Sequence, residues 1–142
     1  MQAKRYLEQI RKIDFMITDK TKDYYRWIAV AEGLGGFSVG DKVQTSKNLQ
    51  QIPDAIGRYI DIDREIAALR DKRAAIIKTL EQLPLFEYRL LYKLYVEDCT
   101  AKEAAYDLGK SHDCIRHRKM YALRMVQKII DREGADASRG SD

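Results

Sequence analysis

Apolar residues recur at alternating spacings of three and four over the first part of the chain, which is the pattern of one helix face. Only Lys20 interrupts the pattern, and a group of glycines that begins at Gly33 ends it. Such a seam predicts a helix of about 45 Å that needs a partner. Its apolar members are Ala3, Tyr6, Ile10, Ile13, Ile17, Tyr24, Trp27, Ala31 and Leu34.

A second seam of similar length begins near Pro53, a residue suited to the first turn of a helix, and ends at Leu83, before Pro84. Two matched amphipathic helices predict an antiparallel coiled-coil hairpin over residues 1–83, with a mobile loop at 33–51. The second seam comprises Ile52, Ala55, Tyr59, Ile62, Ile66, Leu69, Arg73, Ile76, Leu80 and Leu83.

The segment after Pro84 has the pattern of a helix-turn-helix. Thr100 and Glu103 form a capping box for a short helix, Gly109 ends it, and Ser111 is the N-cap of a second helix. That second helix has an apolar stripe of Ile115, Ala122, Leu123, Val126, Ile129 and Ile130. The apolar and aromatic residues from 85 to 96 predict a third helix, which completes a tri-helical unit.

The chain is therefore expected to be all-α. A long antiparallel helical hairpin occupies residues 1–83, a helix-turn-helix unit follows at 84–132, and residues 133–142 form a disordered tail without periodicity. The aromatic flanks of the hairpin leave two alternatives open. They pack on the C-terminal helices, or they pack on a second copy of the chain in a homodimer.

The run from Leu91 to His117 resembles the promoter-reading fourth domain of bacterial sigma factors. The whole chain, with its helical first half and the Gly-Asp-Lys-Val-Gln-Thr-Ser segment at 40–46, resembles ArpU-like phage-encoded regulators of late transcription. This resemblance implies a sigma-factor-like transcription regulator that binds double-stranded promoter DNA in the cytoplasm of the host bacterium. It also implies host RNA polymerase as a candidate partner.

The residues expected to contact DNA lie at the start of the second helix and around the turn before it. His112, Asp113, Arg116 and His117 fall where the sigma-like family places base and phosphate contacts. Arg116 suits guanine or phosphate, and Asp113 suits the amino group of cytosine. Lys102 and Lys110 suit phosphates, as do the amides that follow Ser111. The predicted DNA-binding residues are Lys102, Lys110, Ser111, His112, Asp113, Arg116, His117 and Met120.

Three positions of the second helix stand out. The sigma-like family usually has an apolar residue where this chain has Arg118, and usually a basic residue where it has Tyr121. Lys119 lies near the apolar stripe, so its ammonium group must reach solvent or find a partner.

The charge distribution fits a DNA-binding helix. The chain has 26 Lys and Arg against 22 Asp and Glu. The segment from Lys110 to Arg132 contains seven basic and two acidic residues, which gives it a net charge of +5. A concentrated positive charge attracts phosphates, although a solvated basic helix without a ligand remains the alternative.

Other function classes find little support in the sequence. No apolar run reaches about 18 residues, so no membrane span is expected. Cys99, His112, Cys114 and His117 match no standard zinc-finger spacing, and we expect no metal, no cofactor and no catalysis. The remaining alternative is a phage-encoded modulator or inhibitor that binds a host protein and uses the hairpin and helix-turn-helix as scaffold.

Overall fold

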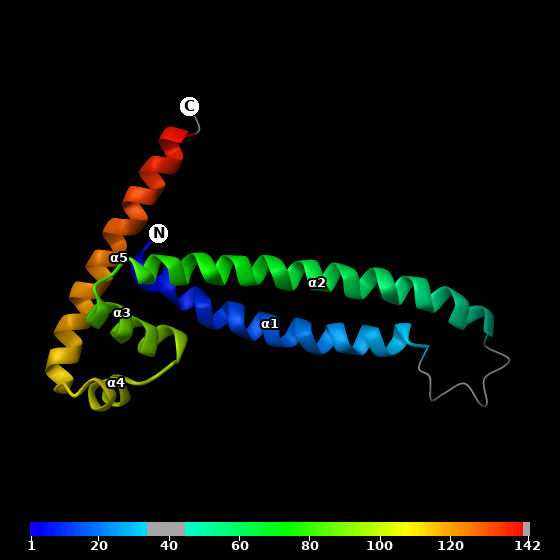
Figure 1. Ribbon diagram of the computed structural model, residues 1–142, viewed down its shortest axis with the longest axis horizontal. Helices are drawn as coiled ribbons and strands as arrows, with labels where there is room; N and C mark the ends of the chain where they lie inside the picture. The colour runs from blue at the N-terminus through cyan, green and yellow to red at the C-terminus, as the bar shows by residue number, and fades with distance from the viewer. Residues whose placement is uncertain (34–44, 141–142) are drawn as a thin grey trace. The chain divides into compact units, whose positions relative to one another are not determined.

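A computed structural model describes residues 1–33 and 45–140, with side chains at 1–33 and 52–136. Every regular element in these ranges is helical, which confirms the all-α prediction. No helix in the described part of the chain has a segment long and apolar enough to cross a membrane. The elements are α1 (Ala3–Ala31), α2 (Thr45–Glu81), α3 (Leu85–Leu91), the π-helical turn η3 (Tyr92–Val96), α4 (Ala101–Leu108) and α5 (His112–Gly140). Figure 1 labels the five α-helices.

The start of α2 differs from the prediction. The helix begins at Thr45, so Pro53 lies inside it and not in its first turn. The helix continues through Pro53, which has no N–H to donate to the carbonyl four residues earlier, so one main-chain hydrogen bond of α2 is missing there. Residues 34–44 of the predicted mobile loop lie outside the described residues.

The end of α5 also differs from the prediction. The helix continues to Gly140, through the segment from Glu133 for which the sequence predicts disorder. Residues 133–136 are exposed, so no burial accounts for this extension. The segment contains no proline, and alanines at 135 and 137 have the highest helix propensity. Residues 141–142 lie outside the described part.

The chain forms two compact units that do not follow the predicted boundary at Pro84. One consists of residues 1–13 and 72–142, and the other of residues 14–71. Both α1 and α2 therefore contribute to both units. The helix-turn-helix belongs to a unit that includes the beginning of the chain.

The unit of residues 14–71 is an antiparallel helix pair. Tyr24 of α1 lies edge-on against Tyr59 of α2, with 5.8 Å between ring centroids, and Lys20 donates to Glu65 at 2.7 Å. Because higher numbers in α1 meet lower numbers in α2, the two segments run in opposite directions. Lys20, which interrupts the apolar seam, is thus held by a carboxylate. Its hydrogen bond and its charge lower the pKa of Glu65.

The other unit encloses a core drawn from all its α-helices. Hydrogen bonds also tie the start of α1 to it: the Ala3 amide donates to Oε1 of Gln127 at 2.8 Å, and the Tyr6 and Thr79 hydroxyls lie 3.0 Å apart. The first residues of the chain are therefore part of the support for α5. The largest fully buried side chains are Leu7, Ile10, Leu80, Leu90, Leu91, Ile115 and Val126.

Candidate nucleic-acid interface

Three residues at the ends of α4 and the start of α5 act in their predicted roles. The Thr100 hydroxyl accepts the Glu103 amide at 3.2 Å, and the Ser111 hydroxyl accepts the Cys114 amide at 3.1 Å. Gly109 closes α4 with φ 66° and ψ 35°, in the left-handed region that favours glycine. These contacts confirm the predicted capping box, helix stop and N-cap.

Small residues bring α4 close to α5. Ala104, Ala105, Leu90 and Ile115 are buried together, and they form the centre of the core beneath the turn. Alanine at two successive core positions lets the backbones of the two helices approach closely. The partly buried residues around this centre are Phe86, Leu94, Ala101 and Leu108.

A partly buried lysine holds α4 against the preceding segment. The Lys93 ammonium lies 3.4 Å from Asp107 of α4 and 3.8 Å from Glu97, and its side chain is 19% exposed. The chain reverses between η3 and α4 at Asp98, which has φ 56°, and the Cys99 amide donates to the Lys93 carbonyl at 2.8 Å. Both ends of α4 are thereby fixed.

All eight predicted DNA-contact residues are solvent-exposed. Ser111, His112, Asp113, Arg116, His117 and Met120 lie within the first three turns of α5 or at its N-cap, while Ile115 and Ala122 of the same helix are fully buried. Lys110 lies in the turn and Lys102 in the first turn of α4. The start of α5 thus presents a polar face to solvent and an apolar face to the core.

Arg118 joins α5 to α3. Its guanidinium donates to Oε1 of Glu87 at 3.0 Å and lies 5.1 Å from the centroid of the Phe86 ring. The Glu87 side chain is 5% exposed, so this pair lies at the edge of the core. Arg118 therefore anchors α5 to α3.

Lys119 finds a partner as predicted. Its ammonium lies 5.9 Å from the centroid of the Tyr95 ring, in η3. Burial raises the pKa of the Tyr95 hydroxyl, and the nearby Glu8 carboxylate raises it further. Arg118 and Lys119 together fix the rotation of α5, which leaves Arg116 and His117 on the exposed side.

The exposed face of α5 continues beyond the predicted site. Tyr121, Arg124, Lys128 and Arg132 follow His117 at spacings of three and four, so these side chains lie along one side of the helix. We call Arg124, Lys128 and Arg132 the basic ridge. The predicted site omits this ridge, although its four-residue spacing is visible in the sequence.

Comparisons with known proteins do not place the chain in a family. No protein-family model, no curated protein and no solved structure matches it.

Proposed function

We propose that the protein is a transcription regulator that binds double-stranded DNA through α4 and α5. The observation that carries this proposal is the exposed cluster of Asp113, Arg116 and His117 on the first turns of a capped helix. The buried stripe of the same helix fixes which side it presents. A polar and positively charged helix of this kind fits the major groove, which is about 12 Å wide.

The parts of the site suit different contacts. Arg116 and His117 project from the first two turns of α5, where a helix that enters the groove reaches base edges. Lys102 and Lys110 precede α5 and suit the phosphates on either side of the groove. The Ser111 hydroxyl accepts the Cys114 amide, which leaves the amides of His112 and Asp113 for a phosphate oxygen.

The sigma-like resemblance of residues 91–117 makes promoter DNA the target that we propose. Nothing in this proposal depends on catalysis, because reading base edges needs only donors and acceptors at fixed positions. The anchoring of Arg118 and Lys119 supports such fixed positions.

The test begins by selecting bound duplexes from a random pool, because the operator is unknown. Affinity for the selected duplex and for an unrelated duplex is then measured by fluorescence anisotropy over a salt series. A specific regulator should prefer the selected duplex, and log K should fall linearly with log salt. Failure to enrich any sequence would contradict the proposal.

Variants then locate the interface. Arg116→Ala and His117→Ala should each weaken specific binding by about 1 to 3 kcal/mol if the side chain contacts a base. Lys78→Ala removes one exposed charge of α2 and is the matched control, for which we expect little change. Unaltered binding by the Arg116 and His117 double variant would contradict a role for α5 in reading DNA.

A further inference from the structure

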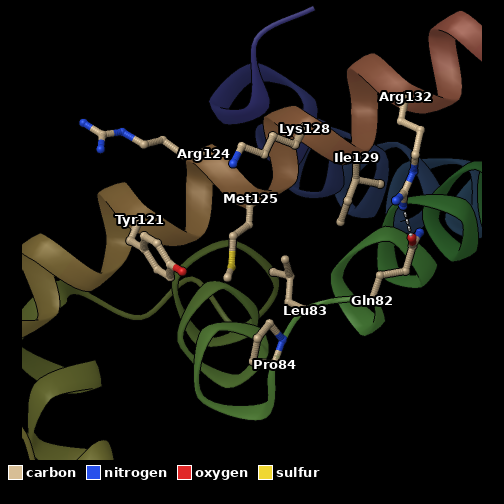
Figure 2. A pocket seen from close by; sticks show the side chains of 9 residues that line it. All are labelled: Gln82, Leu83, Pro84, Tyr121, Arg124, Met125, Lys128, Ile129 and Arg132. Atoms are coloured by element: carbon tan, nitrogen blue, oxygen red, sulfur yellow. Dashed lines mark hydrogen bonds between the residues drawn. The ribbon is translucent and has the colours of Figure 1, made fainter.

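A hollow of about 480 Å³ lies beside the second half of α5. One wall comes from the junction of α2 and α3, and the other from α5. In Figure 2 the side chains of Met125 and Ile129 point from α5 toward Leu83 and Pro84, whereas that of Arg124 extends away from them. The hollow therefore combines an apolar floor with a charged edge.

The apolar floor is open to solvent in part. Leu83 and Ile129 are nearly buried, but Tyr121 is 50% exposed and Pro84 is exposed. A second hollow of about 380 Å³ shares Leu83 and also includes Leu85, which is 72% exposed. A leucine and a tyrosine this accessible, next to two adjoining hollows, favour contact with another apolar surface.

The basic ridge forms the charged edge. Among the described residues, Arg124 and Lys128 have no carboxylate within ion-pair distance, and Arg132 donates to the neutral amide of Gln82 at 3.1 Å. Side chains four residues apart on a helix lie about 6 Å apart. A partner helix with Asp or Glu at the same spacing therefore presents its carboxylates at matching intervals.

DNA is a poorer occupant of this surface. Along a straight helix, Arg124 lies about 12 Å beyond Arg116 and Arg132 about 24 Å beyond it. A recognition helix contacts base edges with its N-terminal residues, so Lys128, about 18 Å beyond Arg116, lies past that part of the helix. Burial against an apolar floor does not stabilise a bound phosphate, but it does stabilise bound leucine and phenylalanine side chains.

We propose that this surface docks an acidic amphipathic helix of a partner protein. Apolar side chains of that helix enter the hollow between Met125 and Leu83, and its carboxylates pair with the basic ridge. This inference is independent of DNA binding, because the ridge and the hollow lie beyond the residues that we assign to DNA.

The experiment uses the full chain and a panel of fluorescein-labelled helical peptides. Each peptide has Leu or Phe on one face and Glu or Asp at four-residue spacing beside it. A second panel replaces the Leu and Phe by Ser, and a third replaces the acids by Lys. Binding is measured by anisotropy, and the bound site is located from methionine methyl NMR shifts of Met125.

We expect binding by the first panel only, with a shift of the Met125 methyl signal. Arg124→Gln combined with Lys128→Gln should weaken that binding about tenfold or more. Lys4→Gln combined with Lys78→Gln removes the same charge from exposed sites elsewhere and should leave peptide binding unchanged. Circular dichroism checks that both double variants keep the parent fold.

Three results would overturn the inference. The first is no binding by any acidic amphipathic peptide. The second is equal binding by the serine panel, which would mean that charge alone attracts the peptides. The third concerns the double variant that combines Arg124→Gln with Lys128→Gln. If it binds peptide as the parent does but loses specific DNA affinity about tenfold, the ridge is a phosphate contact.

Discussion

The contacts of the Arg118 guanidinium with α3 are expected to stabilise the fold. It donates to Glu87, whose side chain is only 5% exposed, and it covers the Phe86 ring. Without the arginine, a buried carboxylate loses its partner. We expect Arg118→Ala to lower the free energy of unfolding by about 1 to 3 kcal/mol, measured by urea denaturation at pH 7.

Arg116→Ala is the matched control for this prediction. Arg116 is exposed on the same helix, and an exposed substitution usually changes stability by less than about 0.5 kcal/mol. Equal stability of the two variants would show that the contact between Arg118 and Glu87 contributes nothing.

The Tyr95 side chain is partly buried, and its buried hydroxyl has no hydrogen-bond partner among the described residues. Tyr95→Phe removes this group and keeps the ring beside Lys119. We expect the free energy of unfolding at pH 7 to rise by about 1 kcal/mol, because a buried polar group without a partner is costly. Urea denaturation measures the change, and a loss of stability would contradict it.

The same residue predicts the behaviour of the protein in alkali. Burial, assisted by Glu8, raises the pKa of Tyr95 above its ordinary value of 10.0. The unfolded chain therefore ionises this tyrosine first, and stability falls as pH rises through 10 toward the higher folded pKa. At pH values well below 10 the residue causes no pH dependence. Tyr95→Phe should make the loss in alkali shallower.

The turn between α4 and α5 depends on one backbone conformation. Gly109 has φ 66°, and no atom within 4 Å would meet an added Cβ. We expect Gly109→Ala to lower the free energy of unfolding by about 1 to 2 kcal/mol from backbone strain alone. Thermal and urea unfolding measure this cost.

Gly109→Asn separates backbone strain from side-chain effects. Asparagine adopts the left-handed region more readily than alanine, so it should cost less, although it is larger. A larger loss for asparagine than for alanine would mean that space, and not the dihedral angles, limits this position.

The elements show which features the sequence predicts. Thr100, Gly109 and Ser111 act on neighbours within four residues, so their roles follow from local pattern. Glu87 and Arg118 are 31 positions apart, so no local sequence pattern predicts their pairing. The π-helical turn at Tyr92–Val96 also has no side-chain signature, because it is a change of main-chain hydrogen bonding.

The ends of the long helices were the least predictable. Pro53 is a general signal for a helix start, and here the preceding residues continue the helix to Thr45. The apolar stripe of Ile115 and Val126 placed Arg116 and His117 on another face of α5, whereas their assignment to DNA came from the sigma-like resemblance.

At the scale of the molecule, the compact units predict which fragments fold. Residues 1–13 joined by a short Gly and Ser linker to 72–142 should unfold cooperatively, because this fragment retains the contacts of Ala3 and Tyr6. The fragment 84–142 lacks Leu7, Ile10 and Leu80 and should not. Circular dichroism on heating distinguishes them, and a cooperative 84–142 fragment would support Pro84 as the boundary of a folding unit.

Exposed apolar residues of the other unit predict self-association. Tyr25 is 64% exposed, and Ile56 and Ile60 are exposed within one turn of Tyr59. A second copy of the chain would cover them. We expect a dimer mass by light scattering at tens of micromolar, and Tyr25→Ser with Ile60→Ser should shift it toward the monomer. A monomer mass for the parent would contradict this expectation.

The hydrogen bond from Ala3 to Gln127 joins positions 124 apart in the chain. During synthesis, the first thirteen residues are made early, but the core to which they belong cannot form until α5 has been synthesised. Residues 14–71 form an antiparallel pair whose own contacts need no later segment. Once this pair forms, it shortens the loop that separates residue 13 from residue 72 and lowers the entropy of closing it. The hairpin thereby reduces the effective separation of the contacts in the other unit. Slower hairpin formation should therefore delay the folding of α4 and α5.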